Sequence, residues 1–452
     1  EIASCLVGSE MCIRDRDDAV SLFSQAIQLG SYNMEARNDA YFWRGESYYR
    51  MGEYENAISD YRTYLNNTRQ RNTDMYALAY YNLGYSYFKL RDYSAALNRF
   101  RQYVDLESNR QAASLADAYN RIGDCLYQNR QFSLAEENYS RAAQLSPSAG
   151  DYSIYQKGFL LGLQKDYKGK ISAMDRLISE YPESQYVDDA LFEKGRSYVL
   201  LENSSSAAQA FEKLIREFPL SSLARKAGIQ LGLLYYNDNQ PEKALAAYKQ
   251  VISNYPGSEE AKIALQDLKS VYIDLNDINA YASYVNSIGG NIRLEVGEQD
   301  SLTYIAAEKL FMRGDNDGAR RSLINYLQTF PEGAFSSNAN FYLGSIAFAK
   351  KEFDEAIQRF KSVIASGDTK FLEESVARTA EIEYLSKDYP AALESFKRLQ
   401  IVAENPENRQ AARLGIMRCA LQTGQQKDAL LAADELLKEP KLSPELEAEA
   451  RY

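Results

Sequence analysis

The side chains that most often carry out catalysis are scarce in this sequence. Its 452 residues contain no histidine, and that removes the commonest general base, the usual partner of a nucleophilic serine and the commonest zinc ligand. The sequence also has no glycine-rich phosphate loop, no nucleophile elbow and no cysteine pair at zinc-binding spacing. We therefore expect a protein that is not an enzyme, with no catalytic residue, no metal and no cofactor.

Acidic pairs are the nearest approach to a reactive cluster. Asp188-Asp189 and Glu373-Glu374 lie where one predicted helix is followed by the next. Carboxylates in the first turn of a helix are stabilised by the partial positive charge of its N-terminus. We interpret both pairs as helix-start charges.

The overall charge narrows the class of partner. Lysine and arginine number 52 against 63 aspartates and glutamates, which gives a net charge of −11. Such a chain repels phosphate backbones and anionic lipid surfaces, so we do not expect nucleic acid or acidic membranes as partners. No apolar run reaches about 18 residues, so we expect no transmembrane segment. Other proteins or peptides remain as the expected partners.

The first sixteen residues do not read as protein. The letters EMCIRDR at residues 10–16 resemble the translated end of a transposase adapter used in preparing DNA libraries, and SCLVGS precedes them. We therefore expect residues 1–16 to be adapter sequence, which is excluded from reasoning about the fold. Cys125 and Cys419 then remain, each at an apolar position of a predicted helix, and we expect both to be buried free thiols.

A repeat of about 37 residues runs along the rest of the chain. It is marked by a small residue, by alanine twelve positions later and by a large apolar residue sixteen positions later. The small positions are Gly45, Gly84, Gly123, Gly158, Gly195, Gly232, Ser270, Ala307, Gly344, Ala380 and Gly415. Lys170 and Lys427 interrupt the alanine row, and Asn286 interrupts the large apolar row.

These spacings predict a helical hairpin in each repeat. The small residue on the first helix and the alanine on the second let two antiparallel helices approach closely. We expect the large residue at the sixteenth position to fill the gap to the next hairpin. A proline twenty-four positions on, at Pro147, Pro182, Pro219, Pro256 and Pro331, is expected to end the second helix.

The pattern is similar to that of the tetratricopeptide-repeat (TPR) family, and the resemblance covers residues 17–452. Units 45, 84, 123, 195, 232 and 344 match the small, alanine and large-residue positions best, while Tyr41, Tyr80 and Tyr119 stand in the family's tryptophan position. The resemblance implies an all-α fold, a right-handed TPR superhelix (α-solenoid) of about eleven helical hairpins, truncated at both ends.

Three turns carry a further resemblance, to envelope TPR proteins of Gram-negative bacteria. Tyr181-Pro182-Glu183-Ser184, Phe218-Pro219-Leu220-Ser221 and Tyr255-Pro256-Gly257-Ser258 resemble turns of the outer-membrane assembly lipoprotein and of the Tol-Pal coordinator. This implies a protein-binding scaffold in the periplasm or at the outer membrane, anchored through a lipid signal that the adapter has replaced. A cytoplasmic regulatory or sensor module of a larger protein is the alternative.

The array is expected to have a joint. The unit at Ser270 is degenerate, and Gly289-Gly290 with the alternating stretch that follows interrupts helical periodicity. We predict an N-terminal array at 17–285, a joint at 286–301 and a C-terminal array at 302–452. An uninterrupted superhelix is the competing interpretation.

The resemblance also implies where a partner binds. In a TPR superhelix the first helices line the concave groove, and the residues one, four and five positions after the glycine face it. The candidates for binding a partner peptide or helix are Glu46, Tyr49, Arg50, Tyr85, Phe88, Lys89, Asp124, Tyr127, Tyr236 and Phe348. The alternative is that Tyr49, Phe88 and Tyr127 only pack between adjacent first helices.

Overall fold

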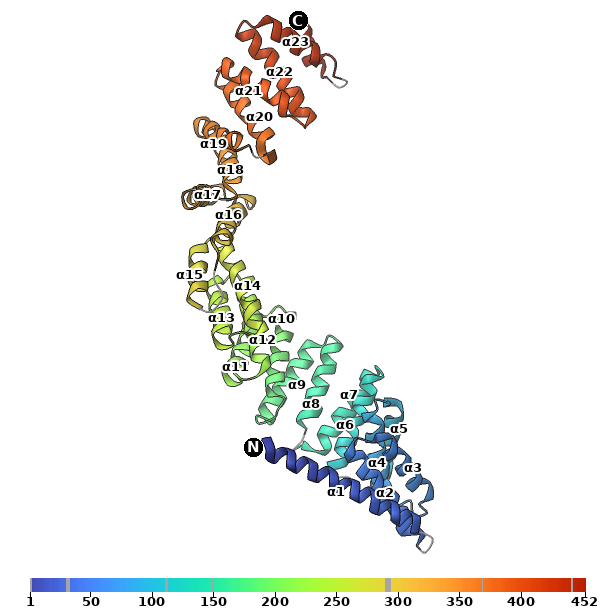
Figure 1. The fold of residues 1–452 in the computed structure, drawn as a ribbon. Helices are drawn as coiled ribbons and strands as arrows, with labels where there is room; N and C mark the ends of the chain where they lie inside the picture. The colour runs from blue at the N-terminus through green and yellow to red at the C-terminus, as the bar shows by residue number, and fades with distance from the viewer. Residues whose placement is uncertain are drawn as a thin grey trace. The chain divides into compact units, whose positions relative to one another are not determined.

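The protein is an array of α-helices joined by short turns. A computed structural model describes residues 2–29, 33–109, 113–147, 150–288, 294–367, 369–439 and 442–452, and in these ranges it contains helices and no strand (Figure 1). The predicted all-α fold is confirmed. By internal contacts the chain divides into two compact units, residues 1–261 and 262–452.

The helices of the first unit follow one another at short intervals. They are α1 (Ile2–Leu29), α2 (Met34–Met51), α3 (Tyr54–Asn67), α4 (Asp74–Lys89), α5 (Tyr93–Leu106), α6 (Ala113–Gln128), α7 (Phe132–Leu145), α8 (Asp151–Leu163), α9 (Tyr167–Glu180), α10 (Val187–Leu200), α11 (Ser204–Glu217), α12 (Ser222–Asn237) and α13 (Pro241–Asn254). The next helix, α14 (Glu259–Asp274), contains the division between the two units.

The second unit continues in the same way. Its further helices are α15 (Ile278–Ile288), α16 (Val296–Met312), α17 (Asn316–Thr329), α18 (Ser336–Ala349), α19 (Phe353–Ser366), α20 (Thr369–Leu385), α21 (Tyr389–Val402), α22 (Pro406–Gln422), α23 (Gln426–Leu436) and α24 (Pro444–Arg451).

The eleven predicted hairpins are all present. Each predicted small residue lies in an even-numbered helix from α2 to α22, and the matching alanine position lies in the odd-numbered helix that follows. Within each unit the second helix of one hairpin packs against the first helix of the next, as α3 does on α4 and α21 on α22. The predicted prolines each lie two residues beyond the end of a second helix, as Pro182 does after α9.

The ends and the joint are less simple. At the N-terminal end, α1 is continuous from Ile2 to Leu29 and packs on α2. That residues 1–16 are adapter sequence stays a prediction. In the predicted joint, α15 ends at Ile288 and α16 begins at Val296, and residues 289–293, including Gly289-Gly290, lie outside the described residues.

Each hairpin turn is built on one residue with left-handed backbone. In nine of the eleven hairpins this residue stands seven positions after the small residue, as do Gly52, Arg91 and Glu202, whose φ angles are 83°, 61° and 57°. Such a residue ends a helix by allowing the chain to reverse. Several second helices are then capped by an aspartate at the next position, for example Asp92, whose carboxylate accepts a hydrogen bond from Ala95 N at 2.9 Å.

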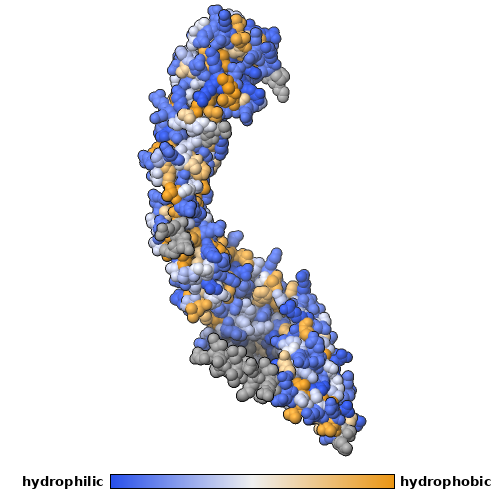
Figure 2. Space-filling view, viewed as in Figure 1, coloured by the Kyte–Doolittle hydropathy of each residue, from blue (hydrophilic) through white to orange (hydrophobic). Residues whose placement is uncertain are grey.

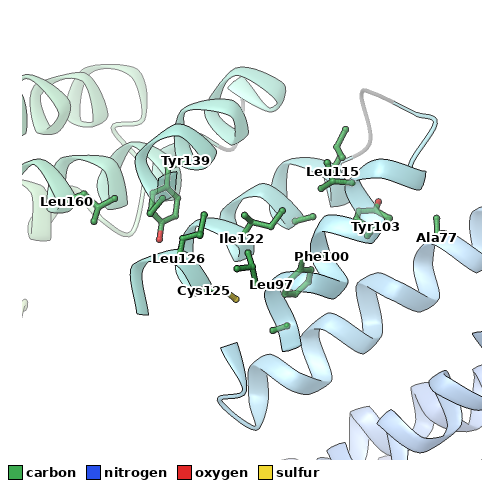
Figure 3. Packing of buried hydrophobic residues seen from close by; sticks show 14 residues of the cluster. Ala77, Leu97, Phe100, Tyr103, Leu115, Ile122, Cys125, Leu126, Tyr139 and Leu160 are labelled. Atoms are coloured by element: carbon green, nitrogen blue, oxygen red, sulfur yellow. The ribbon is translucent and has the colours of Figure 1, made fainter. Parts of the chain in front are cut away.

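The glycines make room for a ring in their own hairpin, a contact that our expectation about the large residue did not include. A Cβ atom on Gly123 would lie 2.6 Å from Tyr139, and one on Gly195 would lie 2.5 Å from Phe211. The ring therefore packs over the glycine sixteen positions before it, and it also meets the next hairpin, since the Tyr139 ring lies 6.4 Å from that of Tyr152 on α8. Figure 3 shows the buried hydrophobic cluster that joins these hairpins, with Phe100 and Tyr139 beside the side chains of α6. Phe396 is different, because its own unit carries Ala380 and the ring lies against Gly415 of the next unit.

In two units the predicted repeat positions on the second helix were wrong, because the hairpin turns of these units differ in length from the others. In the last hairpin the left-handed residue is Gly424, nine positions after Gly415, so the second helix is shifted by two residues. Lys427 and Leu431 are consequently exposed, and Ala429, which is buried, and Ala433, which is half-buried, take their place. The unit at Ser270 is shifted the other way, which exposes Asn286 and buries Val285.

The interruption of the alanine row at Lys170 has a local cause. Gly162 leaves space for the stem of this lysine, because a Cβ on Gly162 would lie 2.7 Å from Lys170 Cδ. The Lys170 ammonium is buried and pairs with Glu193 on α10, the first helix of the following hairpin. A buried charge needs such a partner, so the lysine links two hairpins where an alanine would only pack.

Cys125 and Cys419 are buried free thiols, as predicted. Burial raises the pKa of Cys125 to about 12 and that of Cys419 to about 11. Because the thiolate is the reactive form, we expect both to react with iodoacetamide roughly a hundredfold or more slowly than a free cysteine at about pH 8. Mass spectrometry of the two cysteine-containing peptides, before and after denaturation, measures this. Rapid labelling of the native protein would contradict the burial.

Candidate partner-binding face

The predicted partner-binding residues all lie on first helices. Glu46, Tyr49 and Arg50 are on α2, Tyr85, Phe88 and Lys89 on α4, Asp124 and Tyr127 on α6, Tyr236 on α12, and Phe348 on α18. The first nine belong to the first unit, and Phe348 belongs to the second. We use the name first-helix face for the residues one, four and five positions after the glycine on α2, α4, α6, α8, α10 and α12.

The aromatic members of this face are half-buried and contact their neighbours. The Tyr49 ring lies 6.5 Å from that of Tyr85 on the next first helix. Tyr127 lies 6.3 Å from Phe159 on α8, and Phe88 lies under the Arg121 guanidinium of α6, 5.7 Å away. These contacts are those that packing between first helices requires, and each ring still keeps an exposed part.

Arg121 is the centre of a buried polar network that sequence reasoning missed. Its guanidinium lies 2.6 Å from the Asp124 carboxylate and 3.6 Å from that of Asp117. Asp124 also accepts hydrogen bonds at 2.7 Å from the hydroxyls of Tyr139 and Tyr152. Burial raises the pKa of Asp124, while the Arg121 charge and these two hydroxyls lower it. Asp124, proposed from sequence as a partner contact, is thus already engaged within the protein.

Two further candidates belong to the same connected layer. The Tyr85 hydroxyl donates to Asp117, and burial together with the nearby Asp117 charge raises the pKa of Tyr85. Glu46 accepts hydrogen bonds at 3.1 Å from Tyr61 in its own hairpin and from Asn82 on α4. Both side chains therefore help to fix the spacing of neighbouring first helices.

The exposed part of the face is basic at its N-terminal end and mainly apolar further along, where Arg196 on α10 is also exposed. Arg50 and Lys89 are exposed at its N-terminal end, where Arg50 also pairs with Glu46 at 2.7 Å. Further along, Leu163 on α8 and Leu200 on α10 are 48% and 56% exposed, and Leu233 on α12 is also exposed. Figure 2 shows hydrophobic residues scattered among hydrophilic ones on the face in view. These leucines occupy the same repeat positions as the predicted residues but were not among them.

The turns with the pattern Tyr/Phe-Pro-x-Ser connect successive hairpins through hydrogen bonds. The Ser184 hydroxyl donates to Asp151 at 2.6 Å, and that of Ser221 donates to Asp188 at 2.7 Å. Asp188 and Asp189 lie in the first turn of α10, as predicted. The prediction was wrong for Glu373, which lies beyond the first turn of α20 and accepts hydrogen bonds at 3.0 Å from Glu404 N and Asn405 N of the next turn.

Neither a metal site nor a membrane-spanning helix is found in the described parts of the chain. No group of three or more histidine, cysteine, aspartate or glutamate side chains is placed there to hold a metal ion. No helix within the same ranges has the length and apolar character needed to cross a membrane.

Comparison with known families identifies the class of protein. Family models described as tetratricopeptide repeat match residues 13–74, 81–150, 152–184 and 306–369. The chain belongs to the TPR family. A model described as outer membrane lipoprotein matches residues 188–266, a segment that includes the turns at Pro219 and Pro256, and there the chain resembles envelope TPR proteins.

Solved structures were compared as well. The C-terminal part of a TPR repeat-containing protein from Cytophaga hutchinsonii is 19% identical with a TM-score of 0.47, over 57% of this chain and 97% of that one. PilF of Pseudomonas aeruginosa is 18% identical with a TM-score of 0.37, over 51% and 97%. YrrB, described as a TPR protein with an unusual peptide-binding site, is 22% identical with a TM-score of 0.37, over 45% and 96%. A search of curated proteins found no significant match.

Proposed function

We propose that this protein is a scaffold that binds a peptide or helix of another protein on the first-helix face of its first unit. The observation that carries the proposal is the repetition of one hairpin, which sets equivalent first-helix positions side by side on α2 to α12. A stacked array of this kind offers an extended surface and no enclosed reaction site. Its half-buried aromatic rings are held in place by their neighbours, so a partner meets a largely preorganised surface.

The exposed residues indicate the character of the partner segment. Arg50 and Lys89 favour acidic side chains at one end, and Leu163, Leu200 and Leu233 favour apolar side chains at the other. An amphipathic helix or an extended segment with an acidic end satisfies both requirements. Tyr49, Phe88 and Tyr127 would contribute their exposed edges between these two sections.

We place this function in the cell envelope, in the assembly or maintenance of that compartment. The support is the match of residues 188–266 to the outer membrane lipoprotein model and the three proline turns of the same type. Periplasmic or outer-membrane association then follows, with anchoring through an N-terminal lipid signal.

Affinity capture with matched surface variants tests this proposal. We expect the native array to capture a specific protein from envelope extract and not from cytosolic extract of the same cells. L163E/L200E and R50E/K89E are expected to reduce the capture about tenfold or more, since each replaces one of the two attractive sections of the face by repulsion. The controls are Leu134→Glu, 45% exposed on the second helix α7, and Arg62→Glu, exposed on α3.

The outcomes separate the alternatives. Loss of capture in the first-helix variants alone supports the proposed face. Equal capture by all variants, or equal loss in L134E and L163E/L200E, would show that this face is not where the partner binds.

A further inference from the structure

A large cavity that is half open to solvent lies at the end of the first hairpin, away from the first-helix face. It has a volume of about 1250 Å³ and is lined by the N-terminal half of α2, the end of α3 and the turn that leads into α4. Met34, Arg37, Asn38 and Tyr41 from α2 line it at helical spacing, so one face of that helix forms its wall. The volume exceeds the range of about 300–1000 Å³ common for small-molecule sites, so a small organic molecule and water fit together.

Asn38 lines this cavity and carries an unsatisfied hydrogen-bond acceptor. The residue is only 9% exposed. Its Nδ2 donates to Tyr64 O at 3.2 Å and to Thr68 Oγ1 at 2.7 Å, and the Thr68 hydroxyl itself donates to Tyr64 O at 2.7 Å. These bonds fix the orientation of the amide. Asn38 Oδ1 is buried and has no partner, although a buried polar atom is normally hydrogen-bonded.

Three arginines surround the same space. Arg37, Arg69 and Arg71 all line the cavity, and none of them is within ion-pair distance of a carboxylate in the ranges that the structure describes. The Nε atom of Arg37 is buried without a hydrogen-bond partner. Glu35 and Asp39 also line the cavity, so the cations outnumber the anions there. In a chain of net charge −11, such a local excess of guanidinium groups favours an anionic ligand.

We propose that this cavity binds a small organic polyanion that also carries a hydroxyl or amide donor. The anionic groups pair with Arg37, Arg69 and Arg71, and the donor pairs with Asn38 Oδ1 once the ligand displaces the side chains that cover this buried atom. Both carboxylates and phosphates have the required anionic chemistry. The ligand site is separate from the first-helix face. A failure of this proposal would therefore not contradict the proposed scaffold function, and the reverse also holds.

Isothermal titration at constant ionic strength tests the proposal with defined probes. Citrate has three carboxylates and a hydroxyl, tricarballylate has the carboxylates without the hydroxyl, and glucose 6-phosphate supplies a phosphate with hydroxyls. We expect citrate to bind roughly three- to tenfold more tightly than tricarballylate, the worth of one hydrogen bond. R69A/R71A is expected to weaken citrate binding about tenfold or more, and Arg62→Ala, on α3 outside the cavity, is expected to leave it unchanged.

The results distinguish a carboxylate ligand from a phosphate ligand, and they show when the proposal is wrong. Tighter binding of glucose 6-phosphate than of citrate supports the site and identifies phosphate as the preferred anion. The proposal is overturned if no probe binds, if citrate and tricarballylate bind equally, or if R69A/R71A binds like the native protein. A lower melting temperature of R69A/R71A with unchanged binding would show that these arginines only stabilise the end of α3.

Discussion

Replacing Arg121 with leucine is expected to lower the free energy of unfolding of the first unit by about 3–5 kcal/mol. The side chain is 19% exposed and serves two carboxylates, Asp124 at 2.6 Å and Asp117 at 3.6 Å. Its guanidinium also lies over the rings of Phe88 and Tyr152, at 5.7 and 5.0 Å. Leucine fills some of the volume but leaves both carboxylates without their cation.

The loss of stability caused by Arg121→Leu is expected to increase with pH. Burial raises the pKa of Asp124 above its ordinary value of 3.8, and loss of the Arg121 charge raises it further. A carboxyl group whose pKa is raised in the folded state binds its proton more tightly there than in the unfolded chain. As the pH rises from the unfolded pKa to the folded pKa, the folded state therefore loses stability relative to the unfolded chain. The deficit of R121L relative to the native protein is therefore expected to be larger at about pH 8 than at about pH 5.

Urea unfolding followed by circular dichroism measures both effects. The matched control is Arg141→Leu, which removes a surface ion pair with Glu137 whose side chains are 55% and 54% exposed. That change is expected to cost about 0.5 kcal/mol or less. Equal midpoints for R121L and R141L would show that the Arg121 network contributes no more than a surface pair.

The sequence was sufficient to predict the hairpins because their packing depends on residue size at fixed spacing. Ala57, Ala96 and Ala207 are completely buried at the helix contact, and no larger side chain fits in such a contact. The same spacing did not reveal which helix each ring covers. Gly123 and Tyr139 are sixteen residues apart whichever unit the ring fills, so only the coordinates place the ring in its own hairpin.

Turn length was the second limit. The frames at Ser270 and Gly415 have the expected residue types, but their turns differ by one and two residues, and this rotates the second helix away from the predicted positions. Positions counted from the small residue of the first helix are therefore displaced along the whole second helix. Leu431, 65% exposed where a buried residue was expected, is its clearest consequence.

The candidate face could be predicted only as a set of positions. The repeat identifies the first helices, but it does not tell whether a side chain such as Asp124 is exposed or is paired inside the protein. That depends on residues of neighbouring hairpins, here Arg121, Tyr139 and Tyr152. The exposed leucines on α8 and α10 occupy equivalent positions, and the structure distinguishes them by their lack of covering neighbours.

The whole arrangement depends on one packing relation, in which a first-helix glycine admits the ring of its own second helix. At Gly195 a Cβ would lie 2.5 Å from Phe211, whose ring is completely buried. Gly195→Ala is therefore expected to cost about 1–3 kcal/mol through overpacking, and Phe211→Ala about 3–5 kcal/mol through the cavity that it leaves. Gly297→Ala is the control, because nothing lies within 4 Å of its Cβ position, and it is expected to be neutral or slightly stabilising.

The double-mutant cycle of Gly195 and Phe211 tests this relation most directly. Once the ring is gone, the added methyl group meets no obstacle, and alanine is favoured over glycine inside a helix by about 0.5–1 kcal/mol. We predict that Gly195→Ala destabilises the native protein and stabilises the Phe211→Ala variant, as measured by urea unfolding of the four proteins. An equal loss on adding Gly195→Ala to either background would contradict the packing on which the hairpins, and the face they present, are built.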